Sequence, residues 1–255
     1  MKSILITGAR GGIIGDVINK IRYKYNIILT VHTYDELKMV KRIYKDFNNI
    51  KCYKLDMNNI YDIYKISEFK VDILICNSSV MESGSLMDLP LEKIRSCFDI
   101  NFFNNILLIK RILKNNDNVK IIIMSSLGGL VPMPFCGVYS ASKAAFRQLI
   151  RAFEKEVKLL SRKIDIVIIE PGLYNTGFNE YGFSKKYKYM DDSLFANKME
   201  LVKKIEFLLL KLFEKKNNIT IVTKIVKAID TESPHLFYRA PIFQTIFVKL
   251  YNFFD

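Results

Sequence analysis

The chain has 255 residues, of which 50% are hydrophobic and 25% charged, and its 39 Lys and Arg against 26 Asp and Glu give a formal net charge of +13. This length is enough to bury one large core, and no linker-like stretch or repeat divides it, so we expect a single domain over residues 1–255. The first apolar run is too short for a signal peptide, and no apolar stretch approaches the roughly 20 residues that cross a bilayer. We therefore expect a cytoplasmic protein.

A glycine-rich loop follows the first predicted strand, Lys2–Ile6. The segment Thr7–Gly15 reads Thr-Gly-Ala-Arg-Gly-Gly-Ile-Ile-Gly, and a helical pattern of apolar residues comes after it. Glycines let the backbone pass close to a diphosphate, and the amino end of a helix supplies free N–H groups and a partial positive charge. A loop of this kind between a strand and a helix predicts a dinucleotide site, with an ordinary tight turn as the alternative.

The second predicted strand, Ile27–Val31, ends in His32 and Thr33, and no carboxylate follows before Asp35. An acidic residue at this point binds the adenosine ribose and repels a 2′-phosphate, whereas nearby bases attract that phosphate. Arg10 in the glycine loop is such a base. The pattern therefore favours NADP(H) over NAD(H), although Arg10 as a solvent-facing cation and His32 as a strand cap are the alternatives.

Further apolar strands near residues 50, 71, 119 and 164 alternate with helical segments. This alternation predicts an α/β fold with a doubly wound parallel sheet and right-handed crossovers. The four cysteines show no Cys-x-x-Cys spacing and no histidine cluster accompanies them, so we expect reduced thiols and no metal site.

Three reactive side chains follow the fifth strand. Ser126 lies in the turn after Ile121–Met124, and Tyr139 and Lys143 are four positions apart, which puts them on one helix face. A nearby ammonium lowers the proton affinity of a phenol, whose ordinary pKa is about 10, and makes it a general acid. Ser126 can donate a second hydrogen bond to the same substrate oxygen. Such a pair is a weak signal in a chain with 14 Tyr, but a strand–loop–helix junction is where α/β sheets bind ligands.

Together these motifs resemble the short-chain dehydrogenase/reductase family over nearly the whole chain. The resemblance implies a Rossmann-type fold of three αβα layers and an NAD(P)(H)-dependent oxidoreductase that transfers hydride reversibly between nicotinamide and a carbonyl or secondary alcohol. Ser126, Tyr139 and Lys143 match the catalytic serine, tyrosine and lysine, and Asn101 matches the helix asparagine that positions a proton-relay water. The spacing from Ser126 to Tyr139 is the usual one and favours Ser126 over Ser125.

The resemblance also implies a cofactor-binding set. The glycine loop, the end of the third strand, the motif after the fourth strand and the loop after the sixth strand contribute to it. Its members are Gly8, Arg10, Gly12, Ile14, Gly15, His32, Asp56, Met57, Asn77, Tyr139, Lys143, Pro171, Gly172 and Thr176. Two departures concern cofactor geometry: the last glycine of the loop falls at Gly15, one position later than usual, and Ser78-Ser79 replaces Ala-Gly.

We expect two segments to determine which substrate binds. The segment after the sixth strand forms a lid in this family, which implies a lid at residues 174–215. Ser233–Arg239 resembles the endings of steroid- and retinol-type members, and the apolar tail 242–255 follows it. This resemblance favours a hydrophobic substrate. Ile219–Val222 reads locally as a strand, but the family pattern predicts a helix there and the seventh strand at His235–Arg239.

The expected partners are a small carbonyl or alcohol and further copies of the chain. Apolar residues on the helix predicted at 142–160, together with a second helix at 91–113, favour a homodimer or homotetramer, although Phe146, Leu149, Ile150 and Phe153 can instead cover their own sheet. The basic charge first indicates a solvated surface, then an anionic ligand, and we expect no nucleic acid because no binding motif accompanies it. The alternatives are a catalytically weak nucleotide-binding regulatory or scaffold protein and a peripheral membrane protein whose tail contacts lipid.

Overall fold

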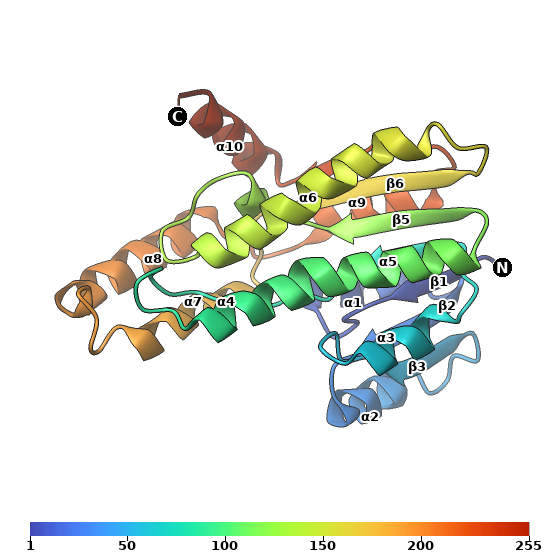
Figure 1. The fold of residues 1–255 in the computed structure, drawn as a ribbon, viewed down its shortest axis with the longest axis horizontal. Helices are drawn as coiled ribbons and strands as arrows, with labels where there is room; N and C mark the ends of the chain where they lie inside the picture. Colours follow the sequence, from blue (N-terminus) through green and yellow to red (C-terminus); the bar gives the residue numbers. More distant parts are fainter. Residues whose placement is uncertain (255) are drawn as a thin grey trace.

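A computed structural model describes residues 1–254, and in this part of the chain seven parallel strands form one sheet. The strands are β1 (Ser3–Ile6), β2 (Asn26–Val31), β3 (Ile50–Lys54), β4 (Ile73–Cys76), β5 (Val119–Met124), β6 (Ile164–Pro171) and β7 (Phe237–Ala240). Their order in the sheet is β3-β2-β1-β4-β5-β6-β7 (Figure 1).

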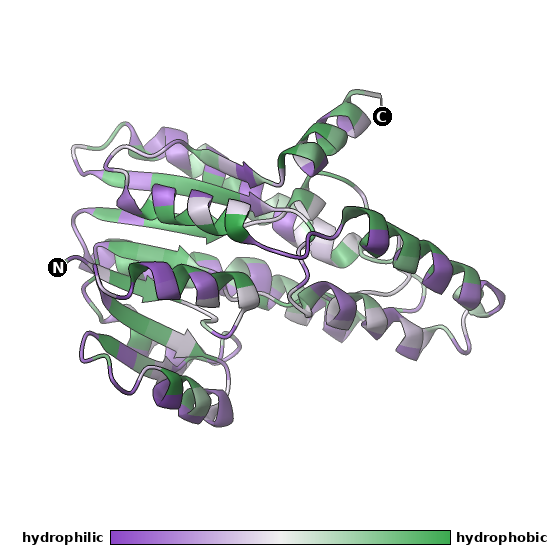
Figure 2. Ribbon diagram, turned by 180° about the vertical axis from the view of Figure 1, so that it is seen from behind, coloured by the Kyte–Doolittle hydropathy of each residue, from purple (hydrophilic) through white to green (hydrophobic). Residues whose placement is uncertain are grey.

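Helices cover both faces of this sheet, which gives three layers. Their bounds are α1 (Gly12–Ile21), α2 (Tyr34–Ile43), α3 (Ile60–Ser67), α4 (Leu91–Phe98), α5 (Asn104–Asn115), α6 (Gly137–Val157), α7 (Phe178–Ser184), α8 (Met199–Phe213), α9 (Ile219–Asp230) and α10 (Ile242–Phe254). The apolar cluster on one face joins the sheet to α1, α2 and α9, and the cluster on the other face joins it to α3, α5 and α6. Figures 1 and 2 show the two faces in turn.

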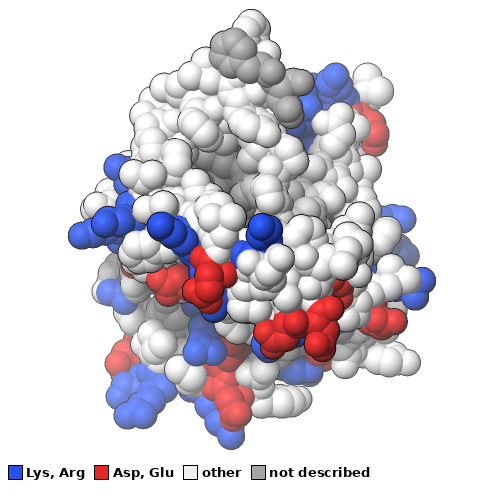
Figure 3. All heavy atoms as spheres, turned by 90° about the vertical axis from the view of Figure 1, so that its left-hand side faces the viewer, with Lys and Arg blue, Asp and Glu red and all other residues white. Residues whose placement is uncertain are grey.

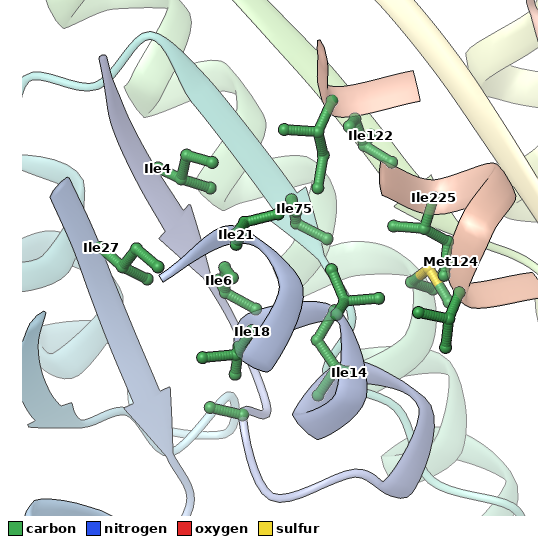
Figure 4. Packing of buried hydrophobic residues seen from close by; sticks show 14 of the residues in the cluster. Ile4, Ile6, Ile14, Ile18, Ile21, Ile27, Ile75, Ile122, Met124 and Ile225 are labelled. Carbon is green, nitrogen blue, oxygen red and sulfur yellow. The ribbon is translucent and has the colours of Figure 1, made fainter. Parts of the chain in front are cut away.

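Alternate side chains of each strand point to opposite faces of the sheet, which divides the core into these two clusters. Ile4 and Ile6 of β1 point into the first cluster, whereas Leu5 between them points into the second, as the two-residue period of a strand requires. Figure 4 shows Ile4 and Ile6 next to Ile18 and Ile21 of α1. Strands covered by helices on both faces read as continuous apolar runs, which explains the isoleucine-rich strands of this sequence.

The strand order reverses between β1 and β4. In a parallel sheet all the carboxyl ends lie at one edge, and ligands bind outside that edge at the point of reversal. The loops after β1, β4, β5 and β6 therefore meet where a site is expected.

The predicted doubly wound parallel sheet is confirmed, with each predicted strand in place. The family pattern also holds in the last third of the chain, because Ile219–Val222 begins α9 and β7 lies at Phe237–Ala240. Two boundaries differ. Helix α6 begins at Gly137, five residues before the predicted start, so Tyr139 lies in its first turn, and the helix expected over 91–113 is interrupted by a π-helical turn at Asp99–Phe103.

The apolar residues of α6 mostly pack against the sheet of their own chain. Phe146 and Ile150 are buried in the second cluster, Phe153 packs against it, and only Leu149 is exposed, by 41%. These contacts favour the alternative that the residues cover their own sheet, since two of the four are buried and Phe153 is partly buried against it; the predicted assembly stays a prediction.

The predicted lid, 174–215, contains α7 and α8, and residues 242–254 of the predicted tail form α10, while residue 255 lies outside the described residues. Among residues 1–254, no helix has both the length and the apolar character needed to cross a bilayer.

Candidate active site

A cavity of about 790 Å³ opens at the carboxyl ends of the strands. One end is formed by the glycine loop and by residues after β2 and β3, and the other end by α8 and α10. The predicted site residues that line it are Gly8, Arg10, Gly12, Ile14, His32, Asp56, Met57, Asn77, Ser126, Tyr139, Lys143, Pro171, Gly172 and Thr176. The structure thus brings together residues that are far apart in the sequence.

Asn77 holds the glycine loop against the end of β4. Its side-chain amide donates to the carbonyl oxygens of Thr7 (3.0 Å) and Gly8 (2.8 Å), and its backbone N–H donates to the Thr7 hydroxyl (2.9 Å). Gly8 has a φ of 65°, and a Cβ there would lie 3.1 Å from the Cα of Ser78. This turn therefore requires glycine.

The amino end of α1 fits an anionic diphosphate. Gly11 precedes the helix without a capping side chain, and the first turn carries no acidic residue, so free N–H groups and the positive end of the helix dipole face the cavity. Gly15 does not line the cavity, and its predicted contact with the cofactor stays a prediction. It lies inside α1 with its N–H bonded to the carbonyl of Gly11 (2.9 Å).

A carboxylate that the sequence analysis missed lies at the adenosine end. Glu36 accepts hydrogen bonds from the Arg10 guanidinium (3.0 Å) and from the backbone N–H of His32 (3.0 Å). Burial alone would raise the pKa of Glu36, but these hydrogen bonds outweigh it and hold that pKa below its ordinary value. Asp56 lies on the other side of His32, with 3.5 Å between Asp56 Oδ1 and His32 Nδ1.

The expectation that no carboxylate lies near the end of β2 is therefore wrong, because the fold brings the Glu36 carboxylate to this point. Asp35 points into solvent, whereas Glu36 turns back because Thr33 caps α2 by accepting the Glu36 N–H (3.2 Å). The signal was present in the sequence as Thr-x-x-Glu, the pattern of a capping box, which brings the side chain of the glutamate back to the start of its helix.

The residues after β5 and the start of α6 form the centre of the cavity. The Ser126 hydroxyl accepts from the Gly128 N–H (3.0 Å) and is hydrogen bonded to the Tyr139 side chain. Lys143 Nζ donates to the carbonyl of Met124 (2.8 Å) and lies 5.8 Å from the centre of the Tyr139 ring. Two hydroxyls and an ammonium thus converge on one stretch of the cavity wall.

Burial dominates the protonation of this centre. It raises the pKa of Tyr139 to about 12, against a smaller lowering by the hydrogen bond from Ser126, and it lowers the pKa of Lys143 to about 8. The prediction that Lys143 lowers the pKa of Tyr139 below its ordinary value is wrong for this arrangement, because loss of water around the phenolate has the larger effect. Tyr139 is therefore a neutral hydrogen-bond donor near neutral pH.

Asn101 is buried beside the cavity and does not line it. Its amide oxygen accepts from the Val80 N–H (2.8 Å), and its amide nitrogen donates to the Val80 carbonyl (2.8 Å) and to the Ser142 hydroxyl (2.9 Å). Ser142 in turn donates to the backbone carbonyl of Tyr139 (2.8 Å). Asn101 therefore acts on the first turn of α6 through Ser142, and its predicted role in positioning a proton-relay water stays a prediction.

The loop after β6 completes the middle of the cavity. A Cβ at Gly172 would lie 1.9 Å from Oε1 of Gln244, and a Cβ at Gly12 would lie 3.0 Å from Thr176. These glycines let α10 and the Thr176 loop approach the backbone closely. Across from them, the Ser125 hydroxyl is buried on the cavity lining and has no hydrogen-bond partner within the described residues, so it offers a polar contact to a bound cofactor.

The far end of the cavity is apolar, with one ion pair between a buried lysine and a partly exposed glutamate. Its walls include Met133 and Phe135 and residues of α8 and α10, namely Val202, Ile205, Leu209, Leu210, Phe213, Phe247 and Val248. Lys186 forms an ion pair with Glu206, and Tyr187 donates to the same carboxylate (2.9 Å). The sequence analysis missed Lys186 and Glu206, because nothing in their spacing indicates that the lid pairs them.

Three comparisons with known proteins agree with this geometry. The family model described as short chain dehydrogenase matches residues 2–186. A probable short-chain type dehydrogenase/reductase of Helicobacter pylori is 30% identical over 58% of this chain and 55% of its own, and the NADPH-dependent 1-acyldihydroxyacetone phosphate reductase of Saccharomyces cerevisiae is 30% identical over 62% and 56%. The crystal structure of a short-chain dehydrogenase/reductase from Burkholderia phymatum in complex with NAD has a TM-score of 0.79 at 16% identity, and the match covers 98% of this chain and 92% of that one.

The chain belongs to the short-chain dehydrogenase family, since the family model covers most of its length. The fold is the Rossmann-type fold of this family. The matched region spans little more than half the length of these curated relatives.

Proposed function

We propose that the protein is an NAD(P)(H)-dependent oxidoreductase that interconverts a hydrophobic carbonyl compound and its alcohol. The observation that carries this proposal is the position of Ser126, Tyr139 and Lys143 between a glycine-lined end and an apolar end of one cavity. The yeast relative is named for the reduction of an acyldihydroxyacetone phosphate, whose acyl group supports a substrate with an apolar part.

In this proposal, each group of residues has a distinct role in binding or catalysis. The glycine loop and α1 bind the diphosphate, and the bound nicotinamide supplies or accepts the hydride. Tyr139 donates its proton to the carbonyl oxygen while Ser126 orients that oxygen. Lys143 supplies positive charge next to the tyrosinate that forms, which stabilises it in a site without water. Asn101 positions the first turn of α6 through Ser142.

A cofactor and substrate screen tests the proposal. NADPH or NADH is titrated by fluorescence, and oxidation of the reduced nicotinamide is then followed with a panel of aliphatic, acyl-chain and steroid ketones. Turnover of an apolar ketone is expected. Cofactor binding without turnover of any carbonyl would favour a nucleotide-binding regulatory or scaffold protein.

We also propose that the protein prefers NADP(H) and that the Arg10–Glu36 pair determines how much more tightly it binds NADPH than NADH. The guanidinium is in place to bind a 2′-phosphate, and the Glu36 carboxylate opposes that phosphate. Arg10→Ala is expected to weaken NADPH binding several-fold with little effect on NADH, and Glu36→Gln to strengthen NADPH binding. Titration of both cofactors checks this, and tighter binding of NADH to the unchanged protein would contradict it.

The pH dependence of carbonyl reduction should reflect the loss of a proton from the Lys143 ammonium. Its pKa of about 8 means that the ammonium is present below pH 8 and is lost as the pH rises through that value. We expect kcat/KM for reduction to fall above pH 8, because kcat/KM reports groups of the free enzyme. In Lys143→Arg the residual activity should lack this fall, since a guanidinium stays charged. A fall that persists in Lys143→Arg would assign it to another group.

Assembly into a homodimer or homotetramer remains a proposal from the family resemblance. On the helices of this predicted interface, Leu91, Phe103 and Leu149 are exposed apolar residues. Light scattering of the purified protein measures the state directly.

A further inference from the structure

Two helices at the open end of the cavity expose most of their apolar side chains. None of the residues of α8 is buried, and six of them are 46–71% exposed: Leu201, Ile205, Phe207, Leu208, Leu209 and Leu212. On α10, six are 38–72% exposed: Ile242, Phe243, Ile246, Phe247, Leu250 and Tyr251. Figure 2 colours α10 largely as hydrophobic and shows hydrophobic and hydrophilic bands along α8. Monomeric proteins rarely expose apolar surface of this extent without a binding role.

Specific contacts along one row hold α10 in place. Gln244 accepts from the Leu173 N–H (2.8 Å) and donates to the Phe213 carbonyl (2.6 Å), Val248 is buried, and Asn252 donates to the Leu130 carbonyl (2.8 Å). These residues are four apart and form one face of the helix. The apolar residues on its other faces are therefore presented outward by a helix that is attached to the protein.

The two helices form one surface around the cavity mouth. Phe213 of α8 stacks on Phe243 of α10, with 6.2 Å between ring centres, and lies 5.2 Å from the ring of Phe247. Ile205, Leu209 and Phe247 are exposed and also line the cavity, so the cavity opens between α8 and α10. Figure 3 shows this side of the molecule as largely uncharged surface in its upper part, hollowed at the centre.

Exposed lysines lie on the same two helices as this apolar surface. Six exposed ones lie on the two helices or directly after α8: Lys203, Lys204, Lys211, Lys215, Lys216 and Lys249. The acidic residues nearby are engaged, because Glu200 pairs with Lys203, Glu206 pairs with Lys186, and Glu214 accepts from Asn179. The Lys215 ammonium lies 5.1 Å above the Phe243 ring, as when a lysine covers apolar surface with its stem and keeps its charge at a polar boundary.

We infer that α8 and α10 bind the surface of a membrane that contains anionic lipids. Apolar helices with lysine margins have the composition of interfacial helices, in which the apolar side enters the acyl region and the lysines meet the headgroups. A second copy of the chain fits this surface less well, because it would bring the same lysines face to face and cover the mouth. Direct entry of an apolar substrate from the bilayer follows if the proposed function holds; membrane binding does not depend on it.

Co-sedimentation of the full chain with vesicles tests the inference. The protein should bind vesicles of phosphatidylcholine mixed with phosphatidylglycerol and bind pure phosphatidylcholine much more weakly. The double variants Leu208→Glu/Leu212→Glu and Ile246→Glu/Leu250→Glu, at exposed positions outside the cavity lining, should each lower the affinity by roughly tenfold or more. Leu159→Glu/Leu160→Glu is the matched control. It adds the same charge at exposed residues beyond the far end of α6 (Figure 1), and it should bind like the unchanged protein.

Cofactor titration of each variant confirms that its fold is intact. Failure of the unchanged protein to bind anionic vesicles, equal binding to neutral ones, or an equal loss in the control would overturn the inference. A dimer seen by light scattering that the α10 variant dissociates, without vesicle binding, would assign the surface to a second copy and overturn it too. Vesicle binding without turnover of any carbonyl would overturn the proposed function alone.

Discussion

Replacing Tyr139 with Phe is expected to lower kcat for carbonyl reduction on the order of 10²- to 10⁴-fold, the usual cost of losing a general acid. The substitution removes the hydroxyl bonded to Ser126 and leaves the ring that packs against Phe178, with 6.2 Å between ring centres. Cofactor affinity should stay within a few-fold, because the glycine loop and α1 are untouched. Steady-state kinetics and cofactor titration on the same preparations measure both effects.

Tyr181→Phe provides the control for this variant. Tyr181 lies on α7 in the predicted lid and is 69% exposed, so the same chemical change there should leave kcat near that of the unchanged protein. Unchanged turnover in Tyr139→Phe would remove Tyr139 from the proposed mechanism.

The sheet and the catalytic centre could be predicted from the sequence because their signals are local. A strand buried on both faces is a short apolar run, the glycine loop follows the first one directly, and Ser126, Tyr139 and Lys143 lie within one strand–loop–helix unit. Local spacing is enough to place such residues together.

The parts that were missed depend on contacts between distant residues or on burial. Glu36 reaches the cavity because of how Thr33 caps α2, and the amide of Asn101 is taken up by Val80 and Ser142. The direction of the Tyr139 pKa shift depends on how completely the folded chain removes water from the phenol. Spacing along a sequence contains none of this information.

The attachment of α6 to the sheet depends on another buried group, Glu170. This carboxylate is 0% exposed at the end of β6 and forms ion pairs with Arg147 of α6 and Arg239 of β7. Both guanidinium groups also lie over the Phe237 ring, at 5.0 and 4.5 Å from its centre. Glu170 therefore joins the helix that carries Tyr139 and Lys143 to the strand that leads into α10.

Glu170→Gln is expected to lower the free energy of unfolding by about 3 kcal/mol, because removing one partner of a buried ionic group leaves the other charges without compensation. Urea denaturation followed by circular dichroism measures this difference. The control is Glu68→Gln, which removes the Glu68–Arg111 pair (2.9 Å) at a carboxylate that is 67% exposed. Solvent already screens that pair, so the control should change the free energy by less than about 0.5 kcal/mol. Equal effects of the two substitutions would show that the Glu170 cluster contributes no more than a surface pair and that packing alone holds α6 against β6.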